Sequence, residues 1–192
     1  MTGCEALLKG FDAFGLTLHR VTKDDLADIC KWRNDPRVRR FMNDRREVNE
    51  KVLQLWLNRS EEDGKSLSYV CSRNGKPFGY EEIKDINTTS GTAECGTFFD
   101  PAQINSGLAL NVFLCREMVL RDLKVSTTLA RVRKENRNSL SLQHMLGGEI
   151  TYEDAQFVIF TICKPGRLAG LKKFAFALGF EEEFDREFSK WQ

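Results

Sequence analysis

The dipeptide Asn74-Gly75 separates two runs of residues that suit β-strands, Leu67–Ser72 and Phe78–Ile86. Asn-Gly is favoured in the tight turn of a two-stranded hairpin, because both of its residues readily adopt positive φ. A third run, Thr92–Phe99, follows another polar turn and stops before a proline. The chain is therefore expected to fold around strands that are joined by hairpins.

The pattern changes after this third run. An apolar stripe at helical spacing predicts a helix from about Gly107 to Asp122, and a strand over Thr127–Arg133 follows it. A short helix then opens at Asn136–Asn138 and stops at Gly147-Gly148. Hairpins followed by an α/β crossover predict an α/β (α+β) fold, with a mixed, mostly antiparallel sheet of six to seven strands and helices on both faces.

The two ends of the chain carry weaker signals. Residues 1–15 are expected to form an N-terminal extension with a short helix near Glu5–Phe14, and residues 165–192 a C-terminal helical extension packed on the domain. Residues 16–164 make up the domain itself. Its remaining elements are expected to be a first strand from Leu16, a helix ending at Pro36, a helix over Val48–Asn58, a strand over Phe157–Cys163 and a helix over Gly166–Phe180.

Composition is typical of a soluble globular domain, with 41% apolar and 30% charged residues in a chain of 192. The formal net charge of +1 gives no electrostatic case for binding nucleic acid. Because no apolar run could span a membrane and no secretory signal is visible, we expect a cytoplasmic protein. The six cysteines form no C-x-x-C pair, which is typical of free thiols in a reducing compartment and predicts no metal site.

The joint before the long helix is a candidate anion site. A helix start presents free backbone N–H groups and a partial positive charge, and Gly107 lets an anion approach the backbone closely. The sequence thus predicts a seat for a diphosphate. The alternative is an ordinary strand–loop–helix joint that binds nothing.

A second polar cluster, Asn136 and Ser139, falls after the strand Thr127–Arg133 and in the first turn of the next helix. Short polar side chains at these positions suit the capping of a helix. Capping is therefore the alternative to ligand binding for at least one of the two residues.

Taken in order, these segments resemble the GNAT acyltransferase superfamily over roughly Leu16 to Cys163. Lys31–Met42 and Ala93–Asp100 look like the branch that acetylates nucleotide-linked amino sugars in bacterial nonulosonic-acid synthesis. Gly107-Leu-Ala109 is similar to the end of the superfamily's pyrophosphate signature, and Asn136-x-x-Ser139 to its motif after the fifth strand.

The resemblance implies that the fourth and fifth strands part, and that acetyl-CoA binds between them as a co-substrate. Its pantetheine arm would meet the exposed backbone of the fourth strand, and its diphosphate would meet the start of the following helix. The residues that the resemblance implies in cofactor binding are Thr97, Phe98, Phe99, Asn105, Ser106, Gly107, Leu108, Ala109, Leu110, Asn136 and Ser139.

Acetyl transfer to an amine needs a proton acceptor, because a primary amine has a pKa of roughly 10. Glu94 on the fourth strand is the first candidate for this base, and Glu81 and Glu82 on the third strand come next. Neighbouring residues of a strand point to opposite faces, so at most one of that pair faces the cleft; we select Glu82. The alternative for each is a solvated carboxylate.

In the resembling enzymes, the region around the arginine-rich stretch Arg37–Arg46 lines the acceptor side. Arginines there could hold the phosphates of a sugar nucleotide. The residues expected to bind the acceptor are Trp32, Arg33, Arg39 and Arg40. The alternatives are a solvated basic helix for the arginines and core packing for Trp32 and Trp56.

Two positions depart from the superfamily pattern. Ile104 stands where the signature usually begins with Gln or Arg, and Gln143 where many members carry a Tyr that protonates the leaving thiolate. The expected function is N-acetylation of a small amine, first an amino-sugar nucleotide, with a protein N-terminus or a polyamine as alternatives. Because of these departures, a non-catalytic module that binds CoA or a protein remains an alternative function. An apolar helix face near Leu171 and Phe174 is compatible with a homodimer.

Overall fold

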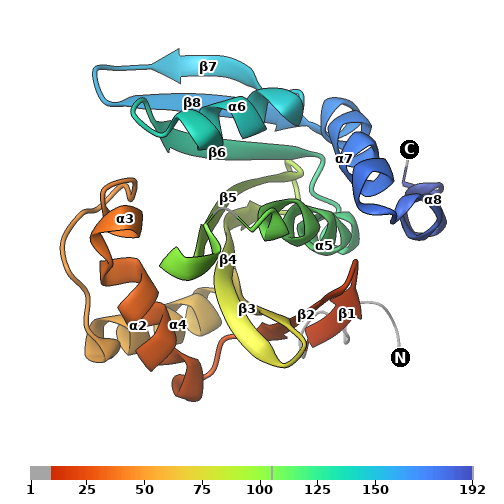
Figure 1. The fold of residues 1–192 in the computed structure, drawn as a ribbon. Helices are drawn as coiled ribbons and strands as arrows, with labels where there is room; N and C mark the ends of the chain where they lie inside the picture. Colours follow the sequence, from red (N-terminus) through yellow and green to blue (C-terminus); the bar gives the residue numbers. More distant parts are fainter. Residues whose placement is uncertain (1–9, 105, 192) are drawn as a thin grey trace.

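The computed structural model describes residues 10–104 and 106–191 (Figure 1). In this part of the chain one sheet of eight strands has the order β1-β2-β3-β4-β5-β6-β8-β7. The strands are β1 (Gly10–Ala13), β2 (Leu16–Arg20), β3 (Leu67–Arg73), β4 (Lys76–Asn87), β5 (Thr92–Phe99), β6 (Thr127–Arg133), β7 (Glu149–Glu153) and β8 (Phe157–Cys163). The predicted mixed, mostly antiparallel sheet is confirmed, but the predicted count of six to seven strands is too low because it lacked β1 and β7.

Helices cover both faces of the sheet (Figure 1). They are α2 (Leu26–Asn34), α3 (Pro36–Arg39), α4 (Glu50–Asp63), α5 (Leu108–Asp122), α6 (Arg137–Met145), α7 (Lys164–Leu178) and α8 (Glu181–Phe188). The larger hydrophobic cluster lies between the sheet and α5, α7 and α8, while a smaller one joins α2 and α4 to the opposite face. None of the described helices is both long enough and apolar enough to cross a bilayer.

Two tight hairpins form in the first half of the sheet, and only one of them was predicted. Asn74 and Gly75 have φ of 51° and 72°, as the turn between β3 and β4 requires. Phe14 and Gly15 have φ of 50° and 72° and make the same kind of turn between β1 and β2. The helix expected over Glu5–Phe14 is therefore wrong from residue 10 onward, and the rest of it lies outside the described residues.

Tertiary contacts explain why a phenylalanine occupies the left-handed position of that turn. The Phe14 side chain is fully buried, with the ring of Phe180 in a T-shaped contact at 5.9 Å and the ring of Phe188 stacked at 6.2 Å between centroids. Its backbone N–H donates to the carboxylate of Glu183 in α8 at 2.8 Å, and its carbonyl accepts from the Asn111 side chain in α5 at 2.8 Å. Helix α8 thus holds the hairpin of β1 and β2.

The pairing between β5 and β6 shapes the functional region. These two strands are the parallel neighbours in the sheet, and they pair only from Thr92 with Thr127 to Glu94 with Leu129. Beyond that point β5 stays paired with β4 as far as Phe99, and β6 stays paired with β8. The two strands therefore diverge and leave a V-shaped opening in the middle of the sheet (Figure 1).

Candidate active site

A cavity of about 820 Å³ occupies the opening between β5 and β6. It passes through the sheet, so residues from both faces line it. Phe113 and Arg116 of α5 lie on one side, whereas Arg33 of α2 and Trp56 of α4 lie on the other. One substrate could therefore enter the cavity from one face of the sheet, and a second substrate could enter from the other face.

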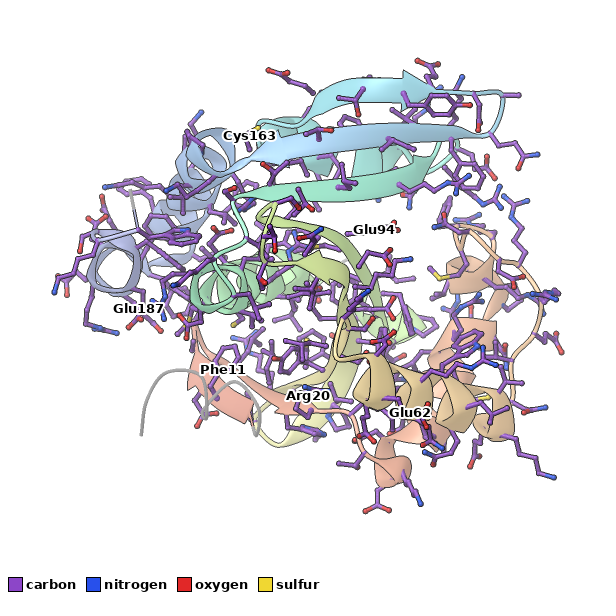
Figure 2. The ribbon with its side chains drawn as sticks, turned by 180° about the vertical axis from the view of Figure 1, so that it is seen from behind. Phe11, Arg20, Glu62, Glu94, Cys163 and Glu187 are labelled. Carbon is purple, nitrogen blue, oxygen red and sulfur yellow. The ribbon has the colours of Figure 1, made fainter. Side chains whose placement is uncertain are left out.

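Glu94 and Glu82, the two predicted bases, both line the cavity. They lie on the same face of the sheet, because Glu94 pairs across the strands with Lys84, two residues after Glu82. Figure 2 shows Glu94 beside β6, on the side of the sheet where α2 and α3 lie. Both carboxylates therefore face the α2–α4 end of the cavity.

Glu94 is held in an ion pair. Its Oε1 lies 3.1 Å from Nζ of Lys84, and both side chains are half-buried. Burial disfavours the charged lysine, but the hydrogen bond and charge of Glu94 outweigh that effect and raise the pKa of Lys84. Glu94 would have to share or give up this partner to accept a proton, which makes it the weaker of the two base candidates.

Glu82 has a different environment. Burial raises the pKa of its carboxyl group, and the nearby charge of Glu94 acts in the same direction. The Tyr80 hydroxyl donates to its Oε1 at a long 3.4 Å. Gly96 is the cross-strand partner of Glu82, and a Cβ there would meet no atom within 4 Å. A carboxylate with a raised pKa beside open space suits a general base.

Glu81 faces the other way, as the alternation along β4 predicts. It is fully buried and accepts from the Thr97 hydroxyl at 2.5 Å, with Nη1 of Arg116 at 3.4 Å. Burial raises the pKa of Glu81 to about 7 against the lowering effect of Arg116. Glu81 is absent from the cavity lining, so it supports the wall and does not reach the ligand space.

The predicted cofactor residues of β5 line the cavity, namely Thr97, Phe98 and Phe99. The ladder with β6 ends at Glu94, so the described chain provides no strand partner for this segment on the cavity side. Backbone N–H and C=O groups along that edge are free to hydrogen bond an extended ligand.

The start of α5 is only partly as predicted. Gly107 caps the helix at φ 80°, and a Cβ there would meet nothing within 4 Å. The N–H of Leu108 donates to Ser106 Oγ at 3.4 Å, and the N–H of Leu110 donates to the Gly107 carbonyl at 3.2 Å. These two donors therefore already have partners. Ala109 lines the cavity, while Ser106, Gly107, Leu108 and Leu110 do not. Asn105 lies outside the described residues.

Asn136 and Ser139 line the cavity from the first turn of α6. The side-chain oxygen of Asn136 accepts from the N–H of Ser139 at 3.2 Å, so the capping alternative holds for Asn136. Among the described residues, neither the Asn136 amide N–H groups nor the Ser139 hydroxyl has a hydrogen-bond partner. Both residues can therefore cap the helix and still offer polar groups to a ligand.

The four predicted acceptor residues separate into two pairs. Arg33 and Arg40 line the cavity. Arg39 instead pairs with Glu47 outside the lining, and Trp32 is 3% exposed in the smaller hydrophobic cluster. The expected role of Trp32 in acceptor binding is therefore wrong, since its side chain is core. Trp56 shows the opposite error, because it is 45% exposed and lines the cavity.

The structure adds Arg133, which the sequence did not single out. Arg133, at the end of β6, donates to the carbonyls of Met42 at 2.7 Å and Asn43 at 3.0 Å, and Arg33 donates to the next carbonyl, Asp44. The loop after α3 is thus held from both walls of the cleft. Arg37 also lines the cavity. Within the described residues, no three metal-ligating side chains gather.

A mixed sheet whose central parallel strands diverge, with a helix start beside the opening, defines the fold of the GNAT acetyltransferases. The acetyltransferase (GNAT) domain family matches residues 15–149. The chain belongs to this family and is an acetyltransferase, and members of the family use acetyl-CoA.

Three known proteins that are similar to this chain illustrate the relationship. Acetyltransferase PseH of Campylobacter jejuni subsp. jejuni (serotype O:23/36, strain 81-176) is 28% identical over 144 residues, which are 74% of this chain and 87% of PseH. The spermidine N-acetyltransferase of Vibrio cholerae, solved with CoA and spermine, has a TM-score of 0.71 at 18% identity and covers 81% of this chain and 99% of its own. Apo FdhC, a nucleotide-linked sugar GNAT, has a TM-score of 0.70 at 17% identity. The match covers 90% of this chain and 96% of the FdhC chain.

Proposed function

We propose that the chain transfers the acetyl group of acetyl-CoA to the amine of an amino-sugar nucleotide. The observation that carries this proposal is the lining of the cavity beside α2–α4, where Arg40 brings positive charge and Trp56 brings an exposed aromatic face, while the guanidinium of Arg37 is already paired with Asp35. Guanidinium groups bind phosphate with paired hydrogen bonds, and aromatic faces stack on bases. The likeness to FdhC, a nucleotide-linked sugar GNAT, supports the same class of substrate.

The acetyl donor would lie in the V. Its diphosphate would sit at the start of α5, where Ala109 lines the cavity and Gly107 leaves the backbone open. Its arm would follow the free edge of β5 and meet Asn136 and Ser139 on the opposite wall. The residues present fit an extended ligand with one anionic end.

The amine would then attack the thioester carbonyl carbon from the α2–α4 side. A carbon–nitrogen bond forms, the carbon–sulfur bond breaks and its electron pair stays on sulfur. Glu82 would accept the amine proton, directly or through a water, and backbone N–H groups of β5 would stabilise the oxyanion. Bringing both substrates into one cleft supplies much of the rate.

A polyamine acceptor is the second candidate, because the Vibrio cholerae spermidine enzyme shares the fold. A polyamine carries several positive charges and would be held by carboxylates. The acceptor side of this cavity presents Arg33, Arg37 and Arg40 together with the carboxylates of Glu82 and Glu94, so its charge alone does not select a polyamine.

The test is an acetyl-CoA turnover assay that follows free thiol with four acceptors: an amino-sugar nucleotide, the same amino sugar without the nucleotide, spermidine and a peptide with a free N-terminus. We expect the sugar nucleotide to have the highest kcat/KM, by about tenfold or more over the free sugar. Equal rates for these two, or a preference for spermidine, would refute the proposed substrate. Tight CoA binding without turnover of any acceptor would favour a non-catalytic module.

The base assignment has its own prediction. Glu82→Gln should lower kcat by about 10²-fold while the affinity for CoA holds, because general-base catalysis contributes roughly that factor. Glu94→Gln should have the smaller effect, since Glu94 is engaged with Lys84. Turnover and calorimetric CoA binding measure the two quantities, and a larger loss for Glu94→Gln would reverse the assignment.

A further inference from the structure

The segment Met42–Arg45, which we call the bridging loop, reaches across the cleft between α3 and α4. All of its residues except Arg45 line the cavity. Arg133 at the end of β6 donates to two of its carbonyls, and Arg45 forms an ion pair with Glu135, which follows β6. Figure 1 shows this loop reaching from α3 toward the end of β6. The bridging loop therefore connects the two halves of the divided sheet.

Arg133 holds the bridging loop firmly. Its side chain is buried, and its Cζ lies 4.5 Å from the centre of the Phe157 ring. Its Nε and Nη2 donate to consecutive carbonyls, those of Met42 at 2.7 Å and Asn43 at 3.0 Å, as the fixed fork of a guanidinium allows. The ladder between β5 and β6 ends at Leu129, so at the level of Arg133 these strands no longer pair. Arg133 thus joins the halves where the strands have parted.

Arg33 of α2 meets the bridging loop from the opposite wall. Its Nη2 donates to the carbonyl of Asp44, the residue after the two that Arg133 holds. Arg33 is 6% exposed and lines the cavity, and its Nη1 is buried with no hydrogen-bond partner among the described residues. A buried donor left unpaired costs free energy, so such groups in native proteins usually meet a ligand or water. The loop carbonyl therefore orients a guanidinium that still has a donor for a ligand.

The side of the cavity on which Arg33 lies indicates which ligand this donor would meet. Arg33 lies on the α2–α4 side, which receives the acceptor in the proposed function, and the inference rests on that function. The two carboxylates of this side, Glu94 and Glu82, pair with Lys84 and with the Tyr80 hydroxyl and not with Arg33. The anionic groups of a sugar nucleotide are its phosphates, and a guanidinium N–H donates to phosphate oxygen in a charge-assisted hydrogen bond.

We propose that Arg133 is a positioning residue for the acceptor. Arg133 holds the bridging loop across the cleft, and the Asp44 carbonyl of the loop orients Arg33. The free Nη1 of Arg33 then donates to a phosphate oxygen of the sugar nucleotide. Arg133 acts on the acceptor through the loop and through Arg33.

The test is a double-mutant cycle with R33M, R133M and R33M/R133M. It measures the acceptor KM of a UDP-linked amino sugar and of the same sugar without the nucleotide. R33M should raise the KM of the sugar nucleotide about tenfold, as expected for one charge-assisted hydrogen bond. R133M should raise it about fivefold, and the double variant no more than R33M alone, because both act on one contact. The free sugar has no phosphate, so its KM should stay within about twofold in all three variants.

Two further measurements separate positioning from a general loss of structure. The kcat and the calorimetric affinity for CoA should stay within about twofold in R133M, because the loop holds neither the base nor the donor. K134M is the matched control: it removes a cation from the next position in the chain, which pairs with Glu153 at 2.6 Å and is absent from the cavity lining. K134M should leave the acceptor KM within about twofold. If R133M lowers CoA affinity, R133K replaces it in the cycle.

The remaining outcomes distinguish this inference from the function on which it rests. If the two single effects multiply to about fiftyfold in the double variant, Arg133 acts independently of Arg33 and the inference is overturned. It is also overturned if R133M leaves the KM unchanged, or if the KM values of both sugars rise equally. In these cases turnover of the sugar nucleotide by wild type still upholds the proposed function. If wild type acetylates no sugar nucleotide, the proposed function fails and the inference fails with it.

Discussion

The Arg167–Glu117 ion pair is expected to be the largest single electrostatic contribution to the fold. The side chains of Arg167 in α7 and Glu117 in α5 are 2% and 1% exposed, and they meet at 2.5 Å and 3.1 Å through two guanidinium nitrogens. Arg167 also donates to the carbonyls of Ile162 at 3.0 Å and Val125 at 3.2 Å. One guanidinium thus joins α7 to α5, to β8 and to the segment before β6.

Arg167→Met removes the cation and leaves a buried carboxylate whose remaining donor is the indole N–H of Trp191, at 3.0 Å. Removing one partner of a buried pair costs about 3 to 5 kcal/mol. In a domain of this size that cost lowers the Tm by about 10 °C. Urea unfolding followed by circular dichroism gives the free energy directly.

The double variant E117L/R167M is the matched control. Replacing both charged groups with apolar side chains is often nearly neutral, so the double variant should recover most of the loss. A loss of less than about 1 kcal/mol for Arg167→Met would refute this reasoning. A double variant as unstable as the single one would show that the carbonyl contacts, not the charge pairing, carry the stability.

Three further predictions follow from the site. Arg40→Glu should raise the KM for the acceptor about tenfold, whereas Arg39→Glu should leave it nearly unchanged, because only Arg40 lines the cavity. Equal effects of the two variants would contradict the placement of Arg40 at the acceptor site. Trp56→Ala should also raise that KM, by about five- to tenfold, whereas Leu55→Ala, an exposed neighbour outside the lining, should not. Burial raises the pKa of Glu81 from 4.5 to about 7, so its contribution to stability is complete below pH 4.5 and lost as pH rises through 7. Between pH 4.5 and 8.5 the unfolding free energy of wild type should fall by about 3 kcal/mol relative to Glu81→Gln, and a constant difference would contradict the assignment.

Local signals predicted the elements that surround the cleft. The Asn74-Gly75 turn, the run Thr92–Phe99 and the strand Thr127–Arg133 all form as expected, because their turn chemistry and apolar patterns depend on neighbouring residues. The helix Leu108–Asp122 agrees with its apolar stripe to within one residue. These elements border the cleft, but the parting of the fourth and fifth strands was implied by the resemblance to the GNAT superfamily and not by the local signals.

Elements that depend on distant parts of the chain could not be predicted in this way. The turn at Phe14 carries no Asn or Asp, and contacts with α5 and α8 hold it instead. Every residue of β7 (Glu149–Glu153) is exposed, so this edge strand shows no buried alternation. Trp56 has an apolar neighbourhood in the sequence, yet the tertiary fold leaves it facing the cavity.

The junction between the first hairpin and α8 has a consequence for synthesis on the ribosome. Phe14 is among the first residues of the described chain to leave the exit tunnel, and Glu183 and Phe188, which complete its surroundings, are among the last. The β1–β2 edge of the sheet cannot reach its final packing until α8 has been translated. A nascent chain stalled before α8 should therefore expose this edge to proteases and chaperones, although every residue that lines the acetyl-transfer cleft has already been synthesised.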